Sequence, residues 1–176
     1  MFRYEWIWQK NKGVNFLNAK HMPLRLHENI LVFYQKLPVY NPQKWQSKPY
    51  TQHKSRNYSS NYVIRGPAAE NYHSESKDGK RYPLDCLQFS IPNSRGKGDK
   101  SHPTQKPVEL LEYLIKTYTN EGETVLDNCI GSGSTAVACV NTNRNFIGFE
   151  TELKYYEIAC KRVTEAQTAK EMKLAL

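Results

Sequence analysis

The segment Val125–Glu150, VLDNCIGSGSTAVACVNTNRNFIGFE, constrains the fold more than any other part of the chain. Its pattern predicts a short apolar strand ending in Asp127, a glycine loop, a helix and a second strand ending in an acid. Gly131 and Gly133 allow a tight turn and close approach of the backbone to a ligand. Glu150 follows the loop by about twenty residues, where a carboxylate can accept hydrogen bonds from a ribose diol. This order predicts a nucleoside-binding half-site, although a lone Gly-x-Gly more often marks an ordinary turn.

The composition of the loop narrows the class of nucleoside. Neither Gly-x-Gly-x-x-Gly nor Gly-Lys-Ser/Thr is present, although pyrophosphate sites and P-loops require them. No Lys or Arg occurs between Asp127 and Asn143. The loop therefore favours a ligand without phosphates. S-adenosylmethionine (SAM) fits, because it combines a ribose diol with a positive sulfonium that acids tolerate.

Segments on both sides of this loop resemble a known family. His102–Ile115 is HPTQKPVELLEYLI, and the helix after the second strand begins ELKYYEIACKRV. Together, residues 101–163 resemble the C-terminal half of the beta-class DNA amino-methyltransferases, the N6-adenine and N4-cytosine family. FRYEWIWQK and HENILVFYQK near the N-terminus resemble the last two sheet strands of that family. The resemblance covers most of the chain except roughly 40–95.

The resemblance implies an α/β fold, Rossmann-like and SAM-dependent, with SAM as the cofactor. Asp127 and Glu150 would bind the nucleoside, and Thr104 and Lys106 would contact the methionine carboxylate. The cofactor-binding residues expected from the matching motifs are His102, Thr104, Lys106, Asp127, Cys129, Gly131, Ser132, Gly133, Ser134, Thr135 and Glu150. Capping and solvation are the alternative roles of the polar residues before the helix. That helix is expected to begin near Pro107 and to stop by Gly122.

Charge separates the chain into two parts. Residues 1–100 hold 17 Lys/Arg and 7 Asp/Glu, whereas residues 101–176 hold 8 and 10. The poorly periodic stretch 37–100 could be a solvated, partly disordered insert. Beside a SAM site, contact with double-stranded DNA is favoured, and in the family this position holds the target-recognition region. The expected DNA-binding residues are Lys44, Lys48, Lys54, Arg56, Arg65, Lys80 and Arg81.

Two aromatic and branched runs near the N-terminus, Tyr4–Trp8 and Ile30–Tyr34, predict strands joined by a loop over residues 11–27. Their side chains are most simply core. As an alternative, Phe33 or Tyr34 could line the pocket of a flipped base, because such a base needs a flat apolar face.

The acceptor of the target amine is missing from this sequence. The family holds that amine with an Asp/Asn/Ser-Pro-Pro-Tyr/Phe/Trp tetrad, and here no two of the nine prolines are adjacent. No catalytic residue is therefore assigned. The strands that carry and follow the tetrad would also be missing, so we expect an incomplete sheet. A second chain could fill it, the chain could be truncated and loosely folded, or a non-standard packing could close the gap. Asn128 also replaces the proline usual after the loop aspartate.

The resulting expectation is one methyltransferase domain: strands over 1–36, a basic insert over 37–100 and a SAM-binding half over 101–176. Adenine-N6 is the expected target, with cytosine-N4 as the second chemistry and a non-catalytic DNA- or SAM-binding module as the alternative class. No apolar run is long enough for a membrane span, and no signal-peptide pattern is present. Four cysteines without Cys-x-x-Cys spacing favour reduced thiols and a cytoplasmic location, and the scattered histidines favour no metal site.

Overall fold

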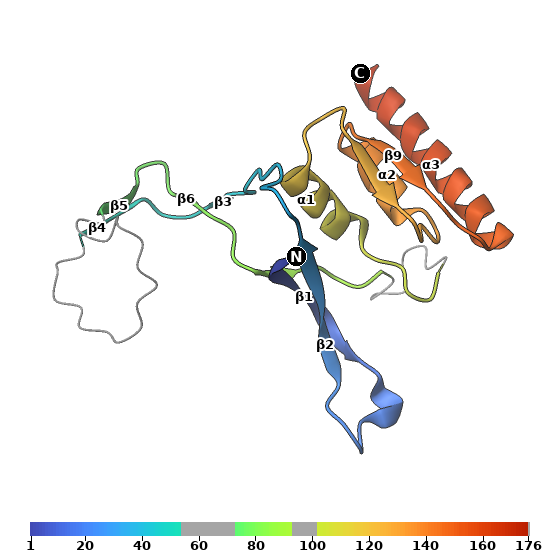
Figure 1. Ribbon diagram of the computed structural model, residues 1–176, viewed down its shortest axis with the longest axis horizontal. Coiled ribbons are helices and arrows are strands. Elements are labelled where there is room, and N and C mark those ends of the chain that lie inside the picture. Colours follow the sequence, from blue (N-terminus) through green and yellow to red (C-terminus); the bar gives the residue numbers. More distant parts are fainter. Residues whose placement is uncertain (54–72, 93–101, 176) are drawn as a thin grey trace. The chain divides into compact units, whose positions relative to one another are not determined.

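The computed structural model describes residues 1–53, 73–92 and 102–175 (Figure 1). The chain divides into two compact units, one formed by Met1–Asn41 with Leu84–Leu176 and the other by Pro42–Pro83. The separate unit is narrower than the expected insert, because residues 84–92 return to the first unit. No helix among the described residues has the length and apolar character to cross a bilayer.

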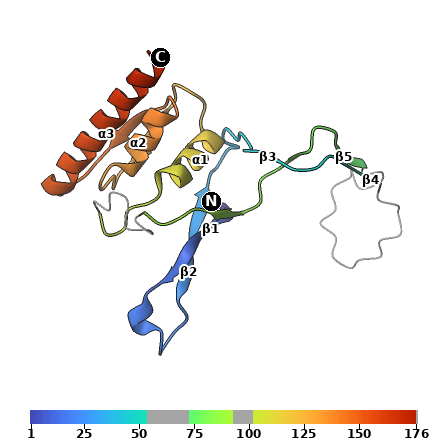
Figure 2. The same cartoon turned by 180° about the vertical axis from the view of Figure 1, so that it is seen from behind.

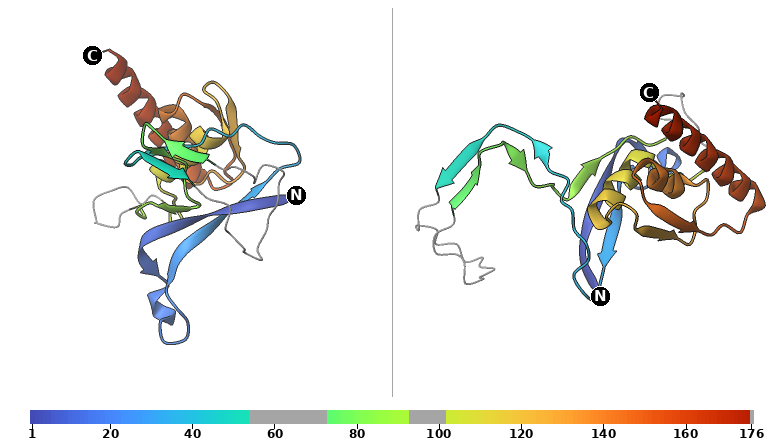
Figure 3. Two further views of the ribbon diagram at one scale, coloured as in Figure 1. Left: turned by 90° about the vertical axis from the view of Figure 1, so that its left-hand side faces the viewer. Right: turned by 90° about the horizontal axis from the view of Figure 1, so that it is seen from above.

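A long hairpin opens the first unit. β1 (Phe2–Val14) pairs antiparallel with β2 (Arg25–Phe33), from the pair Phe2 and Phe33 to the pair Val14 and Arg25. The strands extend well into the region expected to be a loop, so that the connection shrinks to residues 15–24 with a single 3-10 turn, Phe16–Asn18, near the tip (Figure 3). β7 (Cys86–Gln88) adds parallel to β1 and gives the order β2-β1-β7.

The second half of the first unit follows the expected strand–loop–helix–strand order. β8 (Thr124–Asp127) leads through the glycine loop into α2 (Ser134–Asn141), and β9 (Asn145–Gly148) then pairs parallel with β8. α1 (Val108–Tyr118) precedes this unit and α3 (Leu153–Leu174) follows it. α2 lies between α1 and α3 (Figure 2). The right-hand view of Figure 3 shows α1 between the hairpin and α2.

Helix α1 joins two apolar clusters because its hydrophobic residues recur on two faces. Leu110 packs with Trp6, Trp8 and Leu87 of the hairpin sheet. Ile115 packs on its other side against Ala138 and Cys139 of α2. Polar bonds tighten the first contact, since Trp6 Nε1 donates to the Tyr118 hydroxyl at 2.6 Å and Tyr4 shares a hydrogen bond with the same hydroxyl at 2.8 Å. α1 thus fixes the hairpin relative to the glycine loop.

The strands of the first unit form two separate sheets. Among the described residues, β8 pairs only with β9, and the β2-β1-β7 sheet does not continue into them. One face of the β8–β9 pair carries apolar side chains that are largely exposed: Leu126 at 65%, Ile147 at 51% and Phe149 at 59%. Parallel strands of α/β proteins normally have both faces covered. The strand–loop–helix–strand half of a Rossmann-like fold is therefore present, and among the described residues its two strands do not join the β2-β1-β7 sheet.

The unit Pro42–Pro83 consists of short ribbons. β3 (Trp45–Gln46) pairs with β6 (Lys80–Arg81), and β4 (Tyr50–His53) pairs with β5 (His73–Ser76), both antiparallel. None of the buried hydrophobic residues of the described chain belongs to this unit. Isolated two-stranded ribbons are marginally stable, so the side-chain contacts described below matter to its shape.

Candidate functional site

Asp127 organises the glycine loop from the end of β8. Its Oδ1 accepts a hydrogen bond from the Cys129 amide at 3.0 Å, and its Oδ2 accepts one from the Thr135 hydroxyl at 2.6 Å. One carboxylate thus bonds both ends of the loop, and a charged acceptor makes such bonds stronger than neutral ones. The aspartate fixes the loop and the first turn of α2 relative to the strand.

Two glycines allow the backbone to turn between these points. Gly131 and Gly133 have φ of 53° and 80°, in the left-handed region that side chains disfavour. A Cβ at Gly133 would also lie 2.9 Å from Cα and Cβ of Ala159 in α3. The second glycine is therefore required twice, for its backbone conformation and for the close approach of α3.

Glu150 closes the loop from the end of β9. Its Oε2 accepts from the Gly131 amide at 2.9 Å, and its Oε1 accepts from the Glu152 amide at 2.9 Å. The Glu152 bond, reinforced by Gly131, outweighs desolvation and holds the pKa of the Glu150 carboxyl below its usual value. The carboxylate is thus ionised and oriented beside the loop. Each oxygen keeps a further lone pair with which to accept a ligand hydroxyl.

His102 covers the loop from the segment before α1. Its ring carbons lie 3.7–3.8 Å from the Cβ position of Gly131, and the ring packs edge-on against Tyr155 of α3 at 4.3 Å between centroids. His102 Nδ1 also lies 3.1 Å from the Thr104 hydroxyl and accepts from the Thr104 amide at 3.2 Å. The histidine expected near the cofactor is therefore at the loop, and Thr104 holds it there.

Ser132 and Ser134 are buried and contact Arg162 of α3. They are 3% and 6% exposed, and Arg162 Nη1 donates to the Ser132 carbonyl at 2.6 Å. The same nitrogen lies 3.1 Å from Ser132 Oγ and 3.3 Å from Ser134 Oγ. The sequence reasoning missed Arg162. Its signal is the KRV of the helix that follows the second strand, a basic residue that the helix repeat places three residues after Ala159.

Lys106 lies with the hairpin. Its Nζ is 3.0 Å from Glu28 Oε2, while Lys10 Nζ is 2.7 Å from Glu28 Oε1. These side chains line one cavity with Trp8 and Thr104. The structure therefore brings together His102 and the residues of the loop, places Thr104 between the two groups and gives Lys106 a hairpin partner that the sequence did not reveal.

Phe33 and Tyr34 lie away from this region. Phe33 is five residues beyond Glu28 along β2, about 17 Å at the strand rise. It is 60% exposed and packs edge-on against Phe2 with centroids 5.7 Å apart. Tyr34 lines a different cavity, of about 500 Å³, with Tyr4 and Tyr40 among its lining residues. Phe33 thus packs within the hairpin and Tyr34 lines a cavity, and the base-pocket role of both stays a prediction.

The expected DNA-binding residues that are described all lie in the unit Pro42–Pro83. Lys44 Nζ is 4.3 Å from the Tyr82 ring centroid, and the Arg81 guanidinium is 3.7 Å from the Tyr50 ring. Arg81 also donates to the carbonyl of Lys48 at 3.0 Å. Aromatic stacking thus orders two cations on the ribbons. Lys80 lies 3.8 Å from Asp78, while Lys54, Arg56 and Arg65 lie outside the described residues.

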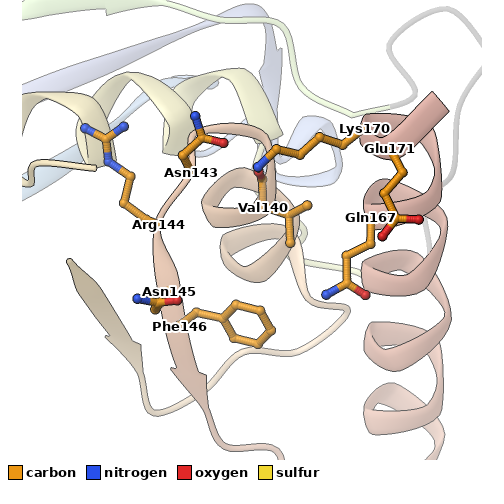
Figure 4. Close-up of a pocket in the computed structure, with 8 residues that line it drawn as sticks. All are labelled: Val140, Asn143, Arg144, Asn145, Phe146, Gln167, Lys170 and Glu171. Carbon is orange, nitrogen blue, oxygen red and sulfur yellow. The ribbon is translucent and has the colours of Figure 1, made fainter. Parts of the chain in front are cut away.

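A cavity of about 570 Å³ occupies the opposite end of β9 (Figure 4). Lys170 Nζ donates to the Val140 carbonyl at 2.7 Å, and Arg144 donates to the Thr119 carbonyl at 2.8 Å. These cations cap the C-terminal ends of α2 and α1. Ligands of open parallel sheets bind at the carboxyl ends of the strands, where the glycine loop lies. No group of three or more potential metal ligands occurs within residues 1–53, 73–92 and 102–175.

The chain is similar to known methyltransferases both in sequence and in structure. The type II methyltransferase M2.MboI of Moraxella bovis is 29% identical over 178 residues, covering 93% of this chain and 65% of its own length. M2.DpnII of Streptococcus pneumoniae is 42% identical over 89 residues, 51% of this chain and 33% of its own. The crystal structure of an M1.HpyAVI–SAM complex superposes with a TM-score of 0.58 at 27% identity, covering 93% of this chain and 62% of the other.

The chain spans less than two thirds of the length of these curated relatives. The match nevertheless runs through the hairpin, the intervening unit and the glycine loop, because the DNA methylase family of N6 and N4 methyltransferases aligns with residues 1–161. With the loop, its two acids and the covering histidine in one place, the chain belongs to this DNA methylase family.

Proposed function

We propose that this chain is the cofactor-binding and DNA-recognition part of a SAM-dependent DNA methyltransferase that acts on an exocyclic amine, with adenine N6 as the target. The observation that carries the proposal is the Glu150 carboxylate, ionised and held at the glycine loop by the Gly131 and Glu152 amides. A carboxylate fixed there suits a ribose diol. The absence of Lys and Arg from the loop suits a ligand without phosphates.

Each residue of the site has a distinct task in this proposal. When bound, SAM supplies an electrophilic methyl group on its sulfonium. Glu150 accepts hydrogen bonds from the ribose, and Asp127 keeps the loop in shape through Cys129 and Thr135. His102 lies over Gly131 and limits the room beside the loop. Thr104 and Lys106 face the methionine end. Positioning of this kind supplies much of the rate enhancement when two reactants must meet.

The unit Pro42–Pro83 is the proposed contact with double-stranded DNA. It holds eight Lys/Arg and three Asp/Glu, and some of its cations are ordered on tyrosine rings. Phosphate contacts of this kind set position and salt dependence, whereas base contacts set the sequence.

A further polypeptide segment completes the catalytic site in this proposal. It carries the Asp-Pro-Pro-Tyr tetrad and the strands that join the two sheets, either in the same polypeptide or in a second chain. The exposed side chains of Leu126, Ile147 and Phe149 support it, because such a face on a parallel pair calls for cover. Cytosine N4 is the second chemistry, and a DNA- or SAM-binding module without activity is the second class. A cytoplasmic location belongs to the same proposal.

Methyl transfer from tritium-labelled SAM to unmethylated DNA tests the proposal. We expect the 176-residue chain alone to remain at background, because its sequence lacks the Pro-Pro tetrad with which the family accepts the hydrogen bonds of the target amine. Adding a segment with the tetrad, fused or as a second chain, should restore turnover. The matched control is the same segment with the tetrad aspartate changed to alanine.

Two results would contradict this account. Multiple turnover by the isolated chain would show that another acceptor exists. A completed protein that binds SAM and DNA but transfers no methyl group would favour the binding-module class.

A further inference from the structure

Two lysines and one glutamate meet beside an indole in the first unit. Lys10 and Lys106 each contact one oxygen of Glu28, at 2.7 and 3.0 Å. Their Nζ atoms lie 5.3 and 5.9 Å from the Trp8 ring centroid. Burial opposes ionisation of Glu28, but the bonds from both lysines outweigh it and hold the pKa of that carboxyl below its ordinary value. The Glu28 carboxylate is therefore ionised at neutral pH, with one lysine at each of its oxygens.

This cluster lines a cavity of about 340 Å³ with an excess of positive charge. Among the residues that the structure describes, the charged groups of its wall are Lys10, Lys106 and Glu28, whose formal charges sum to one net positive charge. Lys10 is the deeper cation, with 7% of its side chain exposed, whereas 43% of the Lys106 side chain is exposed. A buried charge that lacks full compensation is costly. An anion that enters the cavity would relieve this cost.

The donors needed to bind an anion are present. Each ammonium group has three N–H donors, and each forms an ion pair with Glu28. Thr104 adds a hydroxyl to the wall, and Trp8 at 3% exposure closes one side. The wall is also continuous with the candidate cofactor site, because Thr104 bonds His102 over the glycine loop.

We propose that this cavity binds a single oxyanion between Lys10 and Lys106, with Glu28 tuning its affinity. The ligand is a carboxylate or phosphodiester group: the amino-acid end of SAM or a backbone phosphate of DNA. The source of the oxyanion rests on the proposed function, whereas the cavity and its charge do not. Lys10 is the new residue of the site, since it lies on β1, far in sequence from the loop.

Two substitutions predict opposite outcomes. Lys10→Met removes a donor at nearly constant volume and leaves Glu28 paired with Lys106, so it should weaken oxyanion binding about ten-fold or more. Glu28→Gln removes the competing carboxylate, so it should tighten binding. A purely structural ion pair would not give this reversal. Lys12→Met, at an exposed lysine of the same strand, is the control. Thermal melting checks that each variant folds.

Two measurements distinguish the SAM carboxylate from a DNA phosphate as the source of the oxyanion. Calorimetry compares SAM with 5′-methylthioadenosine, which lacks the amino-acid end. If the carboxylate binds, Lys10→Met weakens SAM and leaves methylthioadenosine unchanged. If a phosphodiester binds, both nucleosides are unchanged, and the slope of log DNA affinity against log salt becomes shallower by about 0.9.

The inference is overturned if Lys10→Met alters neither SAM nor DNA binding, or if Glu28→Gln weakens the ligand that Lys10→Met weakens. Failure of the proposed function gives a different result. In that case the wild-type chain binds neither SAM nor methylthioadenosine, and the DNA measurement alone decides whether the cavity takes an oxyanion.

Discussion

The glycine-loop region and the unit Pro42–Pro83 are built on different principles. In the loop region, Asp127 and Glu150 bond backbone amides, and α3 packs directly on Gly133. In the basic unit, short ribbons carry lysine and arginine side chains stacked on exposed or half-buried tyrosines, with no buried apolar side chain among the described ones.

This difference matches the two tasks proposed for them. A small cofactor must be held in one orientation, which requires short hydrogen bonds and a fixed backbone. A charged polymer is attracted over a wide area and needs mainly cations on an accessible surface. Cofactor binding at the loop region should therefore be sensitive to the loss of a single contact. DNA affinity should instead depend on the number of positive charges in the unit Pro42–Pro83.

The largest expected effect is at Gly133. Gly133→Ala places a side chain at positive φ and against Ala159, which should lower the free energy of unfolding by about 3 kcal/mol. Gly122→Ala is the matched control, because Gly122 has the same φ of 80° with open space around its Cβ. Denaturant unfolding measures the loss of stability in both variants. The loss in Gly122→Ala reports the backbone strain alone, and the additional loss in Gly133→Ala reports the steric overlap with Ala159. Equal losses would show that α3 does not constrain the loop.

The second prediction concerns the salt dependence of DNA binding by the unit Pro42–Pro83. Changing Lys44, Lys48 and Lys80 together to Gln should make the slope of log DNA affinity against log salt shallower by about 2.7, roughly forty-fold between 50 and 200 mM salt. Fluorescence anisotropy with a short DNA duplex measures this slope. The matched control is Lys161→Gln with Lys173→Gln on α3, both exposed. A slope that the control shifts as much as the triple variant would remove the recognition role of this unit.

Glu150→Ala should weaken SAM binding about ten-fold or more, because a buried diol without its acceptor costs roughly 1–3 kcal/mol. Calorimetry measures the affinity, and the melting temperature separates loss of the ligand contact from loss of the loop. Glu152→Ala is the control, since it keeps the backbone amide that binds Glu150. Unchanged SAM affinity in Glu150→Ala would exclude the ribose contact.

The smallest expected effect is on thermal stability at acidic pH. The pKa of Glu150 is lower in the folded chain than its ordinary value of 4.5, so its contribution to stability is present above that value and is lost as pH falls through the folded pKa. Wild type should therefore lose melting temperature more steeply below pH 4.5 than Glu150→Gln. If melting temperature falls equally with pH in both proteins, the hydrogen bonds from the Gly131 and Glu152 amides do not depend on the charge of residue 150.

The sequence predicted the loop region well because its requirements are local. Strand, glycines, helix and acid follow one another within Val125–Glu150, and β8, α2 and β9 form in that order. The positive φ of Gly131 and Gly133 and the start of α2 at Ser134 follow from residue types at those positions. The family could also be predicted, because its motifs are short and contiguous.

The tertiary structure decided the contacts between distant segments. Arg162 binds Ser132 thirty residues away, and Lys106 meets Glu28 of the hairpin. Composition and periodicity contain no information on which face of one element meets another. The same reason explains why the edge-on packing of Phe33 against Phe2 on the neighbouring strand could not be predicted from either run of residues alone. Backbone conformation depends on neighbouring residues, whereas the partner of a side chain depends on how whole elements pack.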